Sequence, residues 1–195
     1  MKKFLSLFLI LALMPLMSTC AFVEKKPHKD YLPVMINAAA DGNVDLGRLA
    51  ESCRNELIDN GELHEVKISF DELYLLSRFI CAEAGKDWLT DEYRFCTGEV
   101  ALNRLASPEF PDSLGEVIFQ SGQYSNIDPE SFSQLTKPSR ECVEVAVRLL
   151  QGERMLAPQV VYQSKSRISN VYATFSDYIL GHTYFCETMF PDLYQ

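Results

Sequence analysis

The chain has 195 residues, and its 18 Lys and Arg against 27 Asp and Glu give a formal net charge of −9. This acidic balance, without any run of basic residues interleaved with aromatics, argues against nucleic acid as a partner. An acidic protein also gains no long-range attraction to an anionic wall or membrane, so binding such a polymer requires a shaped groove.

Residues 1–21 have the pattern of a secretory signal peptide. Lys2 and Lys3 precede an apolar run over residues 4–17, and small residues follow. The run is too short to span a bilayer, which takes about 20 apolar residues. The pattern predicts export to the cell envelope or the extracellular space. Two processing outcomes fit it equally: lipidation of Cys20, which would tether the protein to a membrane, or cleavage after Ala21.

Residues 22–65 are interpreted as a leader ahead of the main domain. Its first part, residues 23–33, is polar and contains proline, as linkers do. Apolar residues at helical spacing then predict a helix over residues 46–58, ended by Asn60 and Gly61. The helix carries no evident chemistry, and regulation of the main domain, alone or with a protein partner, is one interpretation of it.

The main domain, residues 66–195, begins with helices. Ser69 is the expected N-cap of a helix that ends at Gly85. Gly98 lies within the next helix, where the absence of a Cβ allows another element to pack closely. Hydrophobic spacing and helix-ending residues predict that this second helix covers residues 91–105. They also predict two further helices, over residues 114–119 and 138–151.

The pattern changes towards the C-terminus. Runs of β-branched and aromatic residues at 159–163 and 182–186 predict two short strands. Helices followed by a small sheet indicate an α+β fold, mainly helical with a small antiparallel sheet, rather than a parallel α/β sheet. Apart from Cys20, an odd number of cysteines remains, with no metal-site spacing. Outside the cytoplasm they allow a disulfide whose partners the sequence does not select.

Glu83 stands out because it shares the apolar face of the first main-domain helix. It lies four residues beyond Phe79 and seven beyond Leu76. Burial would disfavour the charged carboxylate and raise its pKa, which suits a general acid at neutral pH. The alternative is that the helix frays near Gly85 and leaves Glu83 in water.

Several motifs follow one another in a specific order. Residues 81–88 read Cys-Ala-Glu-Ala-Gly-Lys-Asp-Trp, and the later segments are residues 98–105, 107–112, 117–125, 160–163 and 181–185. Together they resemble the SleB-like cell wall hydrolases over about residues 73–186. The resemblance implies a compact, lysozyme-like fold that cleaves the glycan of peptidoglycan, with Glu83 as the catalytic acid. Glu99 and the segment 85–87 depart from the family pattern, which bears on fine specificity more than on the reaction.

The resemblance favours lytic transglycosylation. A single carboxylate suffices if the muramic acid O6 attacks C1 and leaves a 1,6-anhydro product, and the reaction needs no metal or cofactor. Glu99 would be the second carboxylate of a true muramidase if its helix face met Glu83. The other interpretation of Glu99 is a solvated or paired side chain.

Other residues are predicted to line the sugar-binding cleft, because rings and amides suit carbohydrate: Gln123, Tyr124, Tyr162, Gln163 and Tyr184. We expect a structural hydrogen-bonding role for Asn103, whereas Arg104 is either a groove residue or an ordinary helix end. Trp88 is interpreted as a sugar platform or a core residue. His182 resembles the family's strand histidine, and a core role fits it at least as well as catalysis.

Three other classes of protein are considered. A cysteine peptidase would use Cys81 or Cys186 with His182, but no cation near Cys81 in the sequence is expected to lower its pKa. A zinc amidase needs several ligands in a set geometry, and the 3 histidines do not show that spacing. The non-enzyme alternative is a lipid-anchored glycan-binding protein that has lost activity, against which an intact Glu83 argues.

Overall fold

The computed structural model describes residues 30–124, 127, 132 and 137–194. The predicted signal peptide, with Cys20, lies outside the described residues. Within the described ranges, no helix combines the length and the hydropathy needed to cross a membrane.

Two helices open the described chain: α1 (Leu32–Asp41) and α2 (Val44–Asp59). The second is the helix predicted over residues 46–58. The first begins inside the segment interpreted as a linker, because Pro33 occupies the first turn, where a missing N–H costs nothing. Met35, Ala38 and Ala39 of α1 are buried in the same core as the following helices. The N-terminal helices are therefore packed onto the rest of the fold.

Four further helices are α3 (Phe70–Ala84), α4 (Asp91–Ala106), α5 (Leu114–Ile118) and α7 (Arg140–Leu150). Their starts follow from side-chain capping. The residue before each helix is Ser or Thr, and its hydroxyl oxygen accepts a hydrogen bond from a backbone N–H of the first turn. The caps are Ser69, Thr90, Ser113 and Ser139. The helix predicted over 138–151 begins at Arg140 because Ser139 is its cap.

Gly98 marks the closest approach of three helices. A Cβ added to it would lie 2.7 Å from Cδ1 of Ile80 on α3 and 2.6 Å from Cδ1 of Leu149 on α7. Both neighbours are completely buried, so neither has free space to move into. The close packing expected at this glycine is therefore present, and it fixes α4 against α3 and α7.

A three-stranded antiparallel sheet follows, with β1 (Val160–Ser164), β2 (Val171–Asp177) and β3 (Gly181–Glu187) in the order β1-β3-β2. Strands β1 and β3 were predicted, whereas β2 was not. A short 3₁₀ helix, η1 (Pro191–Tyr194), ends the described chain. The predicted α+β fold, mainly helical with a small antiparallel sheet, is confirmed.

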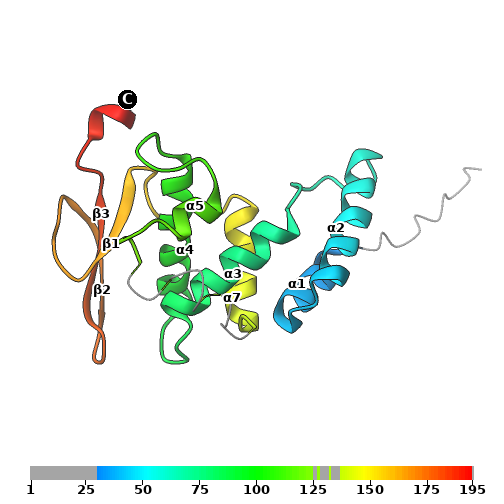
Figure 1. Ribbon diagram of the computed structural model, residues 1–195, viewed down its shortest axis with the longest axis horizontal. Helices are drawn as coiled ribbons and strands as arrows, with labels where there is room; N and C mark the ends of the chain where they lie inside the picture. Colours follow the sequence, from blue (N-terminus) through cyan, green and yellow to red (C-terminus); the bar gives the residue numbers. More distant parts are fainter. Residues whose placement is uncertain (1–29, 125–126, 128–131, 133–136, 195) are drawn as a thin grey trace, which may run out of the picture.

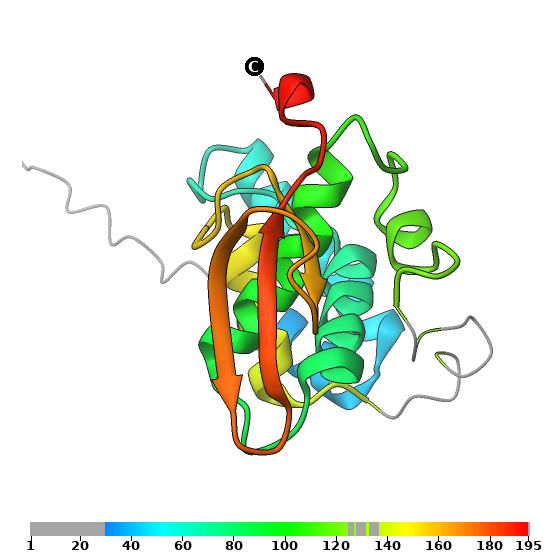
Figure 2. The same cartoon turned by 90° about the vertical axis from the view of Figure 1, so that its left-hand side faces the viewer.

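The elements form layers. Figure 1 shows the sheet at one side of the molecule, then α4 and α5, then α3 with α7, and finally α1 and α2 at the far side. Figure 2, which looks onto the sheet, shows the helices behind it. Helix α4 thus lies between the sheet and the helical core. The five cysteines among the described residues are free thiols.

Candidate active site

Glu83 lies in the last turn of α3, which Gly85 ends. Its side chain is half-buried and lines a pocket of about 270 Å³, here called the Glu83 pocket. Its Oε1 atom is shielded from solvent and has no hydrogen-bond partner among the described residues. The carboxylate therefore faces a pocket at the helix end, not open water.

Burial raises the pKa of the Glu83 carboxyl above its ordinary value. Desolvation is the cause, because removal from water penalises the charged form. Within the described ranges no Lys, Arg or His forms an ion pair with it. A carboxyl in this state keeps its proton to higher pH and is suited to donating it to a substrate oxygen.

Predicted and unpredicted residues meet in the Glu83 pocket. Gln123 and Tyr124, which follow α5, and Gln163 on β1 line it as predicted. The other lining residues were not predicted, and they are Tyr93, Ser164, Lys165, Leu180 and Thr183. The pocket is therefore built from α3, α4, the segment after α5, and the sheet. Within the described chain, Glu83 is the sole carboxylate that lines it.

A hydrogen-bond network centred on Tyr93 orders one wall of this pocket. The Tyr93 hydroxyl accepts a hydrogen bond from Nε2 of Gln163 at 3.0 Å and is hydrogen-bonded to Oγ1 of Thr183 at 3.4 Å. Nζ of Lys165 donates to the same Thr183 Oγ1 at 2.9 Å and to the Leu180 carbonyl at 3.1 Å. These bonds hold an amide and an ammonium group in fixed positions at the pocket, ready to bind polar groups of a ligand.

Arg104 fixes the aromatic part of the site. Its Nε donates to the Val161 carbonyl at 2.6 Å, and its guanidinium carbon lies 4.9 Å from the ring centroid of Tyr124 and 6.0 Å from that of Tyr162. Such contacts restrain both rings. From the sequence, Arg104 was either a groove residue or an ordinary helix end. The structure shows it as a positioning residue for two predicted site tyrosines.

Tyr124 is half-buried between α3 and Arg104, and its hydroxyl is shielded from solvent. Its ring packs edge-on against Phe79, with centroids 4.8 Å apart. Burial raises the pKa of its hydroxyl to about 12, and the nearby Glu83 charge adds to this rise while Arg104 opposes it. Like an ordinary tyrosine hydroxyl, it is protonated at physiological pH and is able to donate a hydrogen bond.

Asn103 and Glu99 on α4 are structural. Nδ2 of Asn103 donates to the carbonyls of Ala157 and Val160, both at 3.0 Å, and so ties α4 to the start of β1, as expected. Glu99 is fully buried, does not line the Glu83 pocket, and accepts hydrogen bonds of 2.9–3.1 Å from backbone N–H groups. The donors are Met155 and Leu156. Of the two interpretations of Glu99, the structure shows the paired one.

Two of the predicted groove residues lie outside the Glu83 pocket. Tyr162 lines a neighbouring hollow instead, because adjacent residues of β1 point to opposite sides and Gln163 faces Glu83. Tyr184 lines neither hollow. On β3 it is Thr183 that reaches the pocket, so Tyr184 points the other way, with Arg167 5.2 Å from its ring centroid.

Trp88 and His182 are both at the surface. Trp88 is 49% exposed and belongs to the turn between α3 and α4. His182 is exposed, and its Nδ1 is hydrogen-bonded to Oγ of Ser176 at 2.8 Å. Neither side chain lines the Glu83 pocket.

The sequence showed no cation that would lower the pKa of Cys81. A hydrogen bond with the Cys142 thiol of α7 lowers this pKa to about 6 against the opposing effect of burial, and Arg94 makes a smaller contribution. Yet Cys81 packs against the helical core, whereas His182 is on the exposed sheet. The structure therefore does not assemble the cysteine–histidine pair that a peptidase would need.

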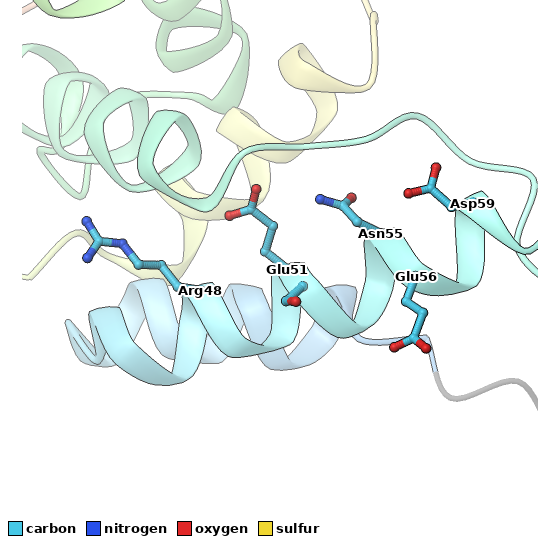
Figure 3. Close-up of a pocket in the computed structure, with 6 residues that line it drawn as sticks. Arg48, Glu51, Asn55, Glu56 and Asp59 are labelled. Carbon is cyan, nitrogen blue, oxygen red and sulfur yellow. The ribbon is translucent and has the colours of Figure 1, made fainter.

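A larger hollow of about 500 Å³ lies on α2 and contains none of the predicted residues. Figure 3 shows Glu51, Asn55 and Asp59 pointing towards the segment that leads into α3, while Glu56 points away. Glu51 accepts a hydrogen bond from the backbone N–H of Phe70 at 2.9 Å, and Asp59 pairs with Lys67 at 2.7 Å. The acidic groups of this hollow thus hold α2 against the residues around the start of α3.

Comparison with known proteins identifies one family. Residues 91–185 match the family model described as Cell Wall Hydrolase. The match covers α4, Lys165 and the sheet up to Phe185, and Glu83 precedes it. No curated protein and no solved structure matches the chain. The match over residues 91–185 supports a SleB-like cell wall hydrolase.

Proposed function

We propose that the protein cleaves the glycan strands of peptidoglycan as a lytic transglycosylase, with Glu83 as its single acid and base. The observation that carries this proposal is the carboxyl of Glu83 in its pocket, half-buried, with Oε1 unpaired among the described residues and its pKa raised. A protonated carboxyl with a free oxygen is what the first chemical step requires.

In the first step the protonated Glu83 donates its proton to the glycosidic oxygen between C1 of muramic acid and the next sugar. The C1–oxygen bond breaks, and positive charge develops at C1 and the ring oxygen. The ionised Glu83 then accepts the proton of the muramic acid O6 hydroxyl while O6 bonds to C1. Glu83 ends protonated, as it began, and the products are a 1,6-anhydro end and a free hydroxyl on the departing sugar.

Neighbouring groups support this cycle. The Tyr124 hydroxyl, which is protonated at neutral pH, is a donor that stabilises the carboxylate or a sugar oxygen. Gln163, held by Tyr93, and Lys165, held by Thr183, are positioned to bind sugar hydroxyl, acetamido or carboxylate groups. Their hydrogen bonds to the protein keep them in place before substrate arrives.

A two-carboxylate hydrolysis is less well supported. The second carboxylate would have to activate water close to the sugar, at a separation of about 5–10 Å from the first. Glu99, the residue considered for this role, is buried and engaged with the N–H groups of Met155 and Leu156. We therefore favour attack by the sugar's own O6 over attack by an activated water.

Product analysis separates the two reactions. The full chain would be incubated with purified peptidoglycan in isotopically labelled water, and the released fragments identified by mass spectrometry. Transglycosylation leaves 1,6-anhydromuramic ends without incorporated solvent oxygen. Reducing ends that carry the labelled oxygen would show hydrolysis instead and would overturn the proposed mechanism while leaving wall cleavage intact.

The substrate also bears on the destination of the protein. We infer that residues 1–21 direct export, because peptidoglycan lies outside the cytoplasmic membrane and the segment has the pattern of a signal peptide. The mass of the N-terminal peptide of the mature protein tests this. A chain that starts at Cys20 with attached lipid indicates a membrane tether, a chain that starts after Ala21 indicates release, and an intact Met1 contradicts export by this signal.

A further inference from the structure

A second pocket adjoins the Glu83 pocket and has a volume of about 420 Å³. We call it the C-terminal pocket, because Phe190 and Leu193 form part of its wall. Phe110 and Tyr162 supply further aromatic surface, and Gln120 and Gln123 supply amides. Gln123 lines both pockets, so they are neighbours on the surface.

The two pockets share a rigid partition. The guanidinium carbon of Arg104 lies 4.9 Å from the ring centroid of Tyr124, in the Glu83 pocket, and 5.1 Å from that of Phe110, in the C-terminal pocket. Its bond to the Val161 carbonyl anchors it to β1. Because one buried side chain supports a wall of each pocket, their relative position is set by the folded core.

The lining of the C-terminal pocket suits a sugar ring that bears an amide. Exposed faces of Phe and Tyr rings pack against the C–H groups of a pyranose, while side-chain amides bind its polar substituents. Oε1 of Gln120 is shielded from solvent and has no hydrogen-bond partner among the described residues. A buried acceptor without a donor costs free energy, and a turn of this side chain into the pocket would let an acetamido N–H satisfy it.

The C-terminal wall is held in place before any ligand binds. The Tyr194 hydroxyl donates to Oε1 of Glu109 at 3.0 Å, and Thr188 Oγ1 donates to the same oxygen. Phe190 and Leu193 nevertheless remain 56% and 52% exposed. Large apolar side chains that are fixed and exposed beside a groove are typical of binding surfaces. Both lie beyond the segment 91–185 that matches the family model.

We propose that the C-terminal pocket is a second glycan subsite, which binds an N-acetylated hexosamine of the same strand next to the sugar at Glu83. Phe190 and Leu193 contact the face of the ring, and Gln120 accepts a hydrogen bond from its acetamido N–H. This inference rests on the proposed function, because it assigns the second pocket to the polymer cleaved at the first.

Binding would be measured by calorimetry with the full chain carrying Glu83→Gln, so that ligands are not cleaved. The ligands are N-acetylmuramic acid alone, which fills only the Glu83 pocket, and a tetrasaccharide of alternating N-acetylglucosamine and N-acetylmuramic acid. We expect Phe190→Ala combined with Leu193→Ala to weaken tetrasaccharide binding about tenfold, the effect of losing one well-packed aromatic contact. Binding of the single sugar should change less than twofold. Leu49→Ala, which removes another exposed apolar side chain, 62% exposed on α2, is the matched control.

A second variant tests the acetamido contact. Gln120→Leu keeps the size of the side chain and removes the acceptor, so it should abolish the preference for N-acetylated over de-acetylated tetrasaccharide. Equal tetrasaccharide affinity in the Phe190 and Leu193 variant and its parent would overturn the subsite, even if the wild-type protein cleaves peptidoglycan in a Glu83-dependent manner. Absence of cleavage by the wild-type protein, with no binding of either ligand, would overturn the proposed function together with the subsite.

Discussion

Replacement of Glu99 by alanine should lower the stability of the fold much more than it affects catalysis. The two carboxylate oxygens accept three hydrogen bonds of 2.9–3.1 Å from the N–H groups of Met155 and Leu156, and the side chain is fully buried. Truncation leaves the buried N–H of Leu156 and the partly buried N–H of Met155 without an acceptor, each worth about 1–3 kcal/mol. Removal of a desolvated carboxyl offsets part of this loss, so we expect a decrease of about 2–4 kcal/mol in the free energy of unfolding.

Glu99→Gln provides the sharper comparison. It retains the shape and one acceptor oxygen, but its NH₂ group must face a backbone donor, so we expect a smaller loss of about 1–2 kcal/mol. Urea denaturation of the full chain measures the stability of each variant. Release of soluble fragments from purified peptidoglycan measures activity, at a temperature where all variants remain folded. The Glu99→Gln variant should then retain activity within a few-fold of wild type.

The opposite pattern would refute this reasoning. A Glu99→Gln protein with the stability of wild type but a hundredfold loss of activity would mean that Glu99 takes part in the chemistry. The two-carboxylate muramidase would then replace the single-acid mechanism, and Glu99 would have to move out of its contacts with Met155 and Leu156 when substrate binds.

Three further predictions concern stability, each measured by urea denaturation. Burial raises the folded-state pKa of Glu83 above 4.5, so its ionisation destabilises the fold increasingly as the pH rises from 4.5 through the folded-state pKa. Glu83→Gln should therefore have the same free energy of unfolding as wild type near pH 4 and a larger one at pH 7. Equal stability of the two proteins at both pH values would contradict the raised pKa. Gly98→Ala should cost about 1–3 kcal/mol, because its Cβ would overlap Ile80 and Leu149, whereas a neutral or stabilising effect would show slack between the helices. Asn103→Ala should cost about 1–3 kcal/mol by removing the donor shared by two carbonyls, and an unchanged midpoint would show that these bonds add nothing.

Local signals in the sequence were sufficient for α2, α3, α4, α5 and α7, whereas α1 was not predicted. Ser69 and Ser139 act as caps as expected, since capping depends on one side chain and the adjacent backbone. Strand β2 was not predicted although Val171, Tyr172, Thr174 and Phe175 are β-branched or aromatic. None of its residues is fully buried, so it lacks the apolar alternation that marks a strand with one face in the core.

The site was only partly accessible to the same reasoning. Glu83 stood out as a carboxylate within an apolar helical stripe, but this pattern left fraying near Gly85 open, and the resemblance to the cell wall hydrolases made it the predicted acid. Thr183 could have been preferred to Tyr184, because strand alternation places it on the same face as the buried Phe185. Lys165 follows the end of β1 and has no periodic signal, so its contact with Thr183 depends on how the strands pair.

The most direct test of the account compares the wild-type chain and Glu83→Gln on purified peptidoglycan, with equal folded protein confirmed by circular dichroism. The initial rate of fragment release is the measured quantity. General acid–base catalysis contributes about 10²–10⁴-fold, so the variant should lose at least a hundredfold in rate while still binding the polymer. Release by Glu83→Gln at the wild-type rate would contradict the central claim that Glu83 is the catalytic acid.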